Sequence, residues 1–113
     1  MIDLPALQRA IQSGAIDEDS VDVVNRKCDK DLDNLSWGFG DVLDCLLEAT
    51  NADFKGSEWC ETTLGRCLPC DAYSIPYDDE SKCRTRGALK YYLKFSLDEG
   101  DILRLQMVST HLS

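Results

Sequence analysis

The stretch that decides the fold lies near the end of the chain: LKYYLKFSL at residues 89–97, DEG at 98–100 and DILRLQMVS at 101–109. Two alternating runs on either side of a short acidic turn with a glycine predict a β-hairpin. Side chains alternate between the two faces of a strand, so one face should be apolar and the other cationic and aromatic. The expected apolar face carries Leu89, Tyr91, Leu93, Phe95, Leu97, Leu103, Leu105 and Met107. The expected opposite face carries Lys90, Tyr92, Lys94, Ser96, Arg104 and Gln106.

The simplest register of this hairpin places Phe95 opposite Leu103. Continued along both strands, it pairs Leu93 with Leu105, Tyr91 with Met107, Lys94 with Arg104 and Tyr92 with Gln106. In this register His111 comes beside Tyr92 only if the hairpin contains a β-bulge.

Helical patterns precede the hairpin. Apolar residues at helical spacing, ended by Gly14, predict a helix over about 4–13. A second helix is expected over about 18–32, because acidic residues precede a narrow apolar stripe. Ser36 is the expected N-cap of a third helix over about 37–49.

The helices come first and the strands follow. We expect a sheet over about 53–110, with Pro76 at an edge or at the end of a strand and a charged loop after it. The sequence therefore predicts an α+β fold in one domain, residues 1–113, with three N-terminal helices packed on one face of a small antiparallel β-sheet that ends in a long hairpin.

Charge is unevenly distributed. The net charge is −9; residues 1–54 carry 4 basic and 12 acidic groups, whereas residues 55–113 carry 8 basic and 9 acidic groups. This balance argues against a general nucleic-acid coat and against DNA binding by this chain alone. The chain also shows no run of apolar residues long enough for a membrane span and no signal-peptide pattern, so we expect no membrane partner and a cytoplasmic protein.

Four of the six cysteines suggest an alternative that the sequence leaves open. Cys60, Cys67, Cys70 and Cys83 have the spacing C-x6-C-x2-C-x12-C, and four thiolates can close a tetrahedral zinc site. The other interpretations are free structural thiols and, for Cys67 and Cys70, a redox pair. We expect no cofactor, with zinc as the weaker alternative.

Proton-exchanging and cationic residues gather in the second half of the chain. His111 is the only histidine, and it follows the hairpin that carries Tyr92. Cleavage of RNA through its own 2′-hydroxyl needs a base, an acid and cations for the charge that develops on phosphorus. The residues that match these needs are Tyr92, His111 and Lys55 for catalysis and Lys94, Arg104 and Gln106 for RNA binding.

At this point the chain resembles the MqsR-type toxins of bacterial type II toxin–antitoxin systems, which are ribonucleases related to the RelE fold. The fragments that carry the resemblance are LPALQRAI (4–11), WGFGDVLDCL (37–46), DFKGS (53–57, similar to D-F-x-K-S), CDAY (70–73, similar to Q-D-V-Y), YLK (92–94, similar to Y-x-K) and VSTH (108–111, similar to V-S-F followed by Lys or His).

The resemblance implies an antiparallel sheet backed by helices, metal-independent cleavage of mRNA, and a cognate antitoxin protein that silences the toxin. Carried over by position, Lys55 corresponds to the lysine after D-F, Tyr92 to the tyrosine of the catalytic face and His111 to the terminal Lys or His. Three positions differ from the family pattern: Gly56, Cys70 and Thr110.

Two other functions remain open on the residues alone. The acidic helical half fits a non-enzymatic protein that occupies a basic surface, as an inhibitor or immunity protein does. The cysteines fit a small zinc-stabilised domain.

Overall fold

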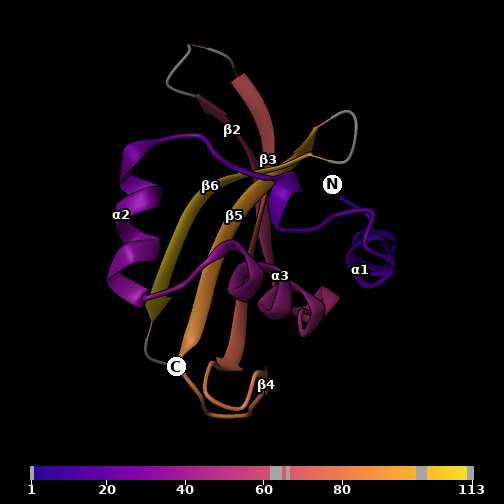
Figure 1. The fold of residues 1–113 in the computed structure, drawn as a ribbon, viewed down its shortest axis with the longest axis vertical. Helices are drawn as coiled ribbons and strands as arrows, with labels where there is room; N and C mark the ends of the chain where they lie inside the picture. The colour runs from indigo at the N-terminus through magenta and orange to yellow at the C-terminus, as the bar shows by residue number, and fades with distance from the viewer. Residues whose placement is uncertain (1, 62–64, 66, 99–101, 112–113) are drawn as a thin grey trace.

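In the part of the chain that the structure describes, three helices and a six-stranded, mostly antiparallel open sheet make up the fold, which confirms the predicted α+β class (Figure 1). The structure is a computed structural model that describes residues 2–61, 65, 67–98 and 102–111; for residues 60, 61, 68 and 111 it describes the backbone alone.

The helices are α1 (Leu4–Ser13), α2 (Arg26–Leu35) and α3 (Phe39–Leu47), with single 3-10 turns η1 (Glu18–Ser20) and η2 (Asn51–Asp53). The strands are β1 (Val21–Val23), β2 (Phe54–Glu61), β3 (Cys67–Asp78), β4 (Cys83–Arg84), β5 (Lys90–Asp98) and β6 (Ile102–His111). The strand order is β1-β6-β5-β3-β2, with β4 paired to the far end of β3, and only β1 runs parallel to its neighbour, β6.

The first helix has the predicted bounds. Asp3 caps it, because its carboxylate accepts a hydrogen bond of 3.2 Å from the Ala6 N–H, and Gly14 ends it in the left-handed conformation with φ of 85°.

The prediction for the second helix is wrong in its first half. Residues 21–23 form β1, which pairs with β6. The helix begins later, and Asn25 caps it because its side-chain oxygen accepts a hydrogen bond of 2.7 Å from the Cys28 N–H. Ser36 is not an N-cap. It has a φ of 57° and ends α2, and α3 begins two residues later than predicted.

The final hairpin forms, but its predicted register is wrong. Phe95 lies opposite Leu105 and Tyr92 opposite Ser109, and a β-bulge between these pairs leaves Gln106 without a partner residue on β5. The bulge reverses the alternation of β6, so that Val108 is fully buried and Met107, which we expected in the core, pairs with Lys94 instead. The acidic turn was predicted at residues 98–100; Asp98 is the last residue of β5, and residues 99 and 100 lie outside the described residues.

The core lies between the helices and the sheet. It combines apolar side chains of all three helices with those of β3, β5 and β6, including the fully buried Leu46, Ile75 and Leu93. Trp37, in the link between α2 and α3, stacks on Tyr91 with ring centroids 4.5 Å apart and an interplanar angle of 16°. Leu97, expected on the apolar face, lies at the margin and remains 36% exposed.

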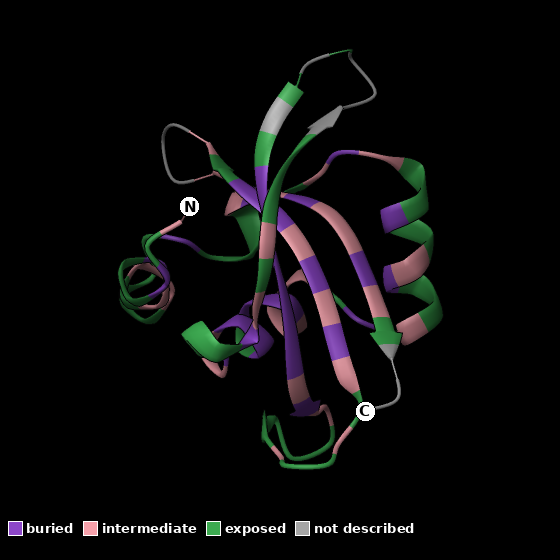
Figure 2. Cartoon of the chain, turned by 180° about the vertical axis from the view of Figure 1, so that it is seen from behind, coloured by how far each residue is buried: buried purple, intermediate pink, exposed green. Residues whose placement is uncertain are grey.

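One face of the sheet remains open. In Figure 2, which views the molecule from behind, no helix of the described residues crosses in front of β3, β5 and β6. Along β5, Lys90, Tyr92 and Lys94 on this side are half-buried and Ser96 is buried, whereas Tyr91, Leu93 and Phe95 on the helix side are buried. We call the open side the outer face. Within the described residues, the three helices are too short and too polar for any of them to cross a membrane.

Candidate functional site on the outer face

The outer face brings together most of the residues that the hairpin pattern assigned to it. The register places Tyr92 between Ser74 of β3 and Ser109 of β6. The side chains on this face are Ala72, Ser74, Lys90, Tyr92, Lys94, Ser96, Arg104, Met107 and Ser109. Tyr92 is thus at the centre of a surface of small and hydrogen-bonding residues.

A hollow of about 150 Å³ adjoins Tyr92. It is lined by Lys55, Gly56, Ser57, Glu58, Ala72 and Tyr92. Lys55 occupies the position where the β2–β3 register shifts, and the next residue, Gly56, has a φ of 137°. A side chain at position 56 would strain this backbone, which gives a physical reason for a lysine at 55 rather than at 56. The structure therefore brings Lys55 and Tyr92 to one hollow.

Lys94 is not a free cation. It forms an ion pair with Glu58, and its side chain is only 13% exposed. It lies opposite Met107 rather than beside Arg104, as the predicted register had it. Any phosphate that contacts Lys94 has to compete with the Glu58 carboxylate.

Arg104 is also neutralised. Its guanidinium forms ion pairs with Asp22 of the neighbouring strand β1 and, at 3.3 Å from Nε, with Asp98. Two carboxylates on one guanidinium give this residue a structural role at the edge of the sheet, where it links β1 to β6. Gln106, the third predicted RNA-binding residue, lies in the bulge. Its backbone carbonyl accepts a hydrogen bond of 3.2 Å from Asn25 Nδ2.

His111 belongs to β6 rather than following it. Its backbone pairs with Lys90, one diagonal step from Tyr92, and diagonal neighbours in a sheet are about 7–8 Å apart. This proximity comes from the register: Phe95 lies opposite Leu105 rather than Leu103, and the bulge at Gln106 shifts the rest of β6 by one further residue. The side chain of His111 lies outside what the structure describes.

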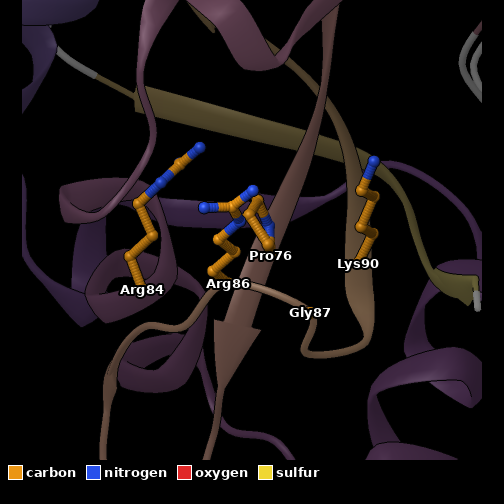
Figure 3. Close-up of a pocket in the computed structure, with 5 residues that line it drawn as sticks. All are labelled: Pro76, Arg84, Arg86, Gly87 and Lys90. Carbon is orange, nitrogen blue, oxygen red and sulfur yellow. The ribbon is translucent and has the colours of Figure 1, made fainter. Parts of the chain in front are cut away.

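A second group of cations, which the sequence patterns did not indicate as a site, lies at the end of the outer face. Arg84, Arg86 and Lys90 line a hollow of about 590 Å³ together with Pro76 and Gly87 (Figure 3). The sequence does contain an indication of this group, because the segment RTRGALK, residues 84–90, carries three cations in an otherwise acidic chain. The expected charged loop covers residues 78–87, and the structure forms the short strand β4 (Cys83–Arg84) within it.

Asp53 holds Arg84 in place. Arg84 donates 2.5 and 3.0 Å hydrogen bonds to the two Asp53 oxygens and a third, of 3.2 Å, to the Glu48 carbonyl at the end of α3. Burial opposes ionisation of Asp53, but hydrogen bonds from Arg84 and Thr50 outweigh it and hold the pKa of this carboxyl below its usual value. The pair therefore stays charged at neutral pH.

Three of the four cysteines of the zinc alternative, Cys67, Cys70 and Cys83, do not converge. Cys70 is buried, whereas Cys67 and Cys83 are exposed. Cys83 pairs with Asp78, eight residues along β3 from Cys70, so their backbones are separated by about 26 Å at the usual rise of a strand. A zinc ion needs all its sulfur ligands within about 2.3 Å. In the described part of the chain no group of three or more potential ligands is present; the side chain of Cys60 lies outside it.

Comparisons of the chain with protein-family models, with curated proteins and with solved structures give no match.

Proposed function

We propose that this protein is a cytoplasmic, metal-independent endoribonuclease that binds single-stranded mRNA on the outer face of its sheet, and that it acts as the toxin of a toxin–antitoxin pair. The observation that carries the proposal is the position of Tyr92, which shares a hollow with Lys55 and lies one diagonal step from the backbone of His111. The arrangement of helices on the other face, as in the RelE-like fold, supports it. The resemblance of the hairpin and of DFKGS to MqsR-type toxins supports the choice of substrate.

The chemistry would proceed through the RNA's own 2′-hydroxyl. A base removes the proton, the 2′-oxygen attacks phosphorus, and the bond to the 5′-oxygen breaks as an acid protonates that oxygen. The products are a 2′,3′-cyclic phosphate and a free 5′-hydroxyl. Tyr92 and His111 are the proposed proton carriers, and Lys55 is the proposed cation for the charge on phosphorus.

The ion pairs change the expected division of roles. Because Lys94 and Arg104 already have carboxylate partners, the accessible positive charge on this face falls to Lys55 and Lys90, which make no ion pair with any described residue. Lys94 then contacts phosphate only if Glu58 moves away.

The test is cleavage of a transcript at neutral pH in EDTA. Wild-type protein should produce fragments ending in 2′,3′-cyclic phosphate, and Tyr92→Phe and His111→Ala should each slow cleavage by about 100-fold. Tyr91→Phe is the matched control, because it makes the same chemical change on the helix side of the same strand. An intact transcript with wild-type protein, or equal rates for Tyr92→Phe and Tyr91→Phe, would count against the proposal.

A cellular experiment tests the partner. Expression of the chain should arrest growth, and co-expression of a small adjacent gene, the proposed antitoxin, should relieve the arrest. Wild-type toxicity that persists unchanged in the Tyr92→Phe and His111→Ala forms would show that the arrest has another cause.

The ion-paired state of Lys94 and Arg104 favours one other function, a non-enzymatic acidic binding protein. Asp17 and Asp19 are exposed at η1 and belong to the acidic half of the chain. This function is distinguished by salt-sensitive binding to a basic protein that charge reversal at Asp17 and Asp19 weakens, together with an intact transcript in the cleavage test.

A further inference from the structure

The hollow at the Gly87 turn is a concentration of positive charge in an acidic protein. Its volume is about 590 Å³, and three of its five lining residues are cations, Arg84, Arg86 and Lys90, with no carboxylate among the five. Figure 3 shows the three cationic side chains extending in the same general direction from backbone on either side of Gly87. The chain has 21 acidic and 12 basic residues. A random distribution of charged side chains over the surface would therefore place acidic residues beside these cations.

The three cations differ in how they are held. Arg84 is fixed by Asp53 and by the Glu48 carbonyl, so its guanidinium has a defined position at one wall. Arg86 and Lys90 form no ion pair with any residue that the structure describes. The hollow thus combines Arg84, whose charge Asp53 already compensates, with two cations that have no carboxylate partner among the described residues. Arg86 and Lys90 are therefore the two cations that can bind a phosphate group.

The hollow is continuous with the outer face. Lys90 pairs with Pro76 just as Tyr92 pairs with Ser74, so the hollow begins two residues along β5 from Tyr92. At the usual rise of a strand, this separation is about 7 Å. An RNA strand seated at Tyr92 can therefore reach the hollow with an adjoining phosphate.

We propose that the hollow formed by Arg84, Arg86 and Lys90 binds a phosphate group, and that this phosphate belongs to an RNA strand that crosses Tyr92 and runs along β5 toward Gly87. The assignment of this phosphate to RNA rests on the proposed function, whereas the existence of a phosphate-binding site in the hollow does not. Arg86 and Lys90 contact the phosphate, and Asp53 acts through Arg84 as a positioning residue.

The first experiment measures RNA affinity. Fluorescence anisotropy follows binding of a fluorescein-labelled, single-stranded RNA whose 2′-oxygens are methylated, so that it binds without being cleaved. Arg86→Gln and Lys90→Gln should each weaken binding by about tenfold, as expected for loss of one charge-assisted hydrogen bond. Each should also reduce the slope of log affinity against log salt concentration by about 0.7.

The controls carry the same change in net charge. Arg9→Gln and Lys30→Gln remove exposed cations from α1 and α2, away from the outer face, and should leave affinity within about twofold of wild type. Thermal melting of each variant checks that the fold is retained. If wild-type protein binds the RNA and the pocket variants equal these controls, the phosphate site is wrong while the proposed function stands.

The second experiment uses inorganic pyrophosphate and separates the two sources. The amide resonances of Arg86, Gly87 and Lys90 should shift on titration of ¹⁵N-labelled wild-type protein and should stop shifting in the double variant Arg86→Gln/Lys90→Gln. Shifts without any RNA binding would support a phosphate site and overturn both its RNA source and the proposed function. Absence of both responses would overturn the proposal entirely.

Discussion

Lys94 of β5 and Glu58 of β2 form an ion pair across the intervening strand β3. The lysine side chain is 13% exposed and the glutamate side chain 60% exposed, so the partner that can leave is the glutamate. On the proposed RNA-binding surface, Glu58 therefore competes with phosphate for the charge of Lys94.

Replacement of Glu58 should strengthen RNA binding. Glu58→Gln removes the competing carboxylate and frees Lys94, and we expect an affinity about threefold higher at physiological salt, measured by anisotropy with the methylated RNA. Glu80→Gln makes the same chemical change at an exposed position in the β3–β4 turn and should have little effect. Equal affinities for the two variants would show that Glu58 does not limit access to Lys94.

The two tryptophans should differ sharply in their contribution to stability. Trp37 is buried against Tyr91, so Trp37→Ala should lower the free energy of unfolding by about 3–5 kcal/mol, measured by urea denaturation. Trp59 is 73% exposed on β2, and Trp59→Ala should change the free energy of unfolding by less than about 0.5 kcal/mol. A large loss in Trp59→Ala, or a small one in Trp37→Ala, would contradict the described burial.

Deletion of Gln106 tests the bulge. Without this residue, the pairs Phe95–Leu105 and Lys94–Met107 follow one another directly, so the deletion removes the bulge while Val108 stays opposite Leu93 in the core. We expect the deletion to lower the free energy of unfolding by only about 1 kcal/mol, a few degrees in the thermal midpoint, because it removes the backbone carbonyl that accepts a hydrogen bond from Asn25.

Gln106→Ala is the control for this deletion, because it keeps the number of residues in β6 and the backbone carbonyl that accepts from Asn25. It should melt within a few degrees of wild type. A deletion variant that melts about 10 °C or more below Gln106→Ala would show that Val108 has left the core and would contradict this register.

The pair of Asp53 and Arg84 should make stability depend on pH in the acid range. The pKa of Asp53 lies below its usual value in the folded state, so its contribution is complete above the unfolded pKa of about 3.9 and is lost as pH falls through the folded pKa. Asp53→Asn should cost about 1–2 kcal/mol at pH 7, a value reduced because Arg84 is 36% exposed.

The measurement is the melting temperature of wild type and Asp53→Asn at pH 7, 5 and 3. The difference should be constant between pH 7 and 5 and should narrow below about pH 4. Asp33→Asn, at an exposed position of α2, should follow the wild type throughout. A difference between wild type and Asp53→Asn that does not change with pH would contradict the ionised pair.

Local sequence patterns were sufficient to predict the helices and strands whose periodicity and end residues lie within a short stretch of chain. The alternation of 89–97 predicted β5 and its two faces, because a strand has a period of two whatever its partner is. The apolar spacing and terminal glycine of 4–13 predicted α1 for the same kind of reason. Tyr92 and Lys55 could be assigned to one surface from their residue types and the resemblance, and the structure places both at one hollow.

Only the tertiary structure decided which residues lie opposite one another. Val21–Val23 reads as the start of a helix in isolation and becomes a strand because β6, about 80 residues later, offers hydrogen bonds to it. The carboxylate partners of Lys94 and Arg104, which are Glu58 and Asp22, likewise come from segments far apart in the chain. The bulge at Gln106 and the cation pocket at Gly87 also depend on how neighbouring strands pair. The period of a pattern is set by the backbone geometry of neighbouring residues, and the sequence alone therefore determines it. The register is set by the sum of core contacts and ion pairs across the folded molecule, and those exist only once the distant strands have met.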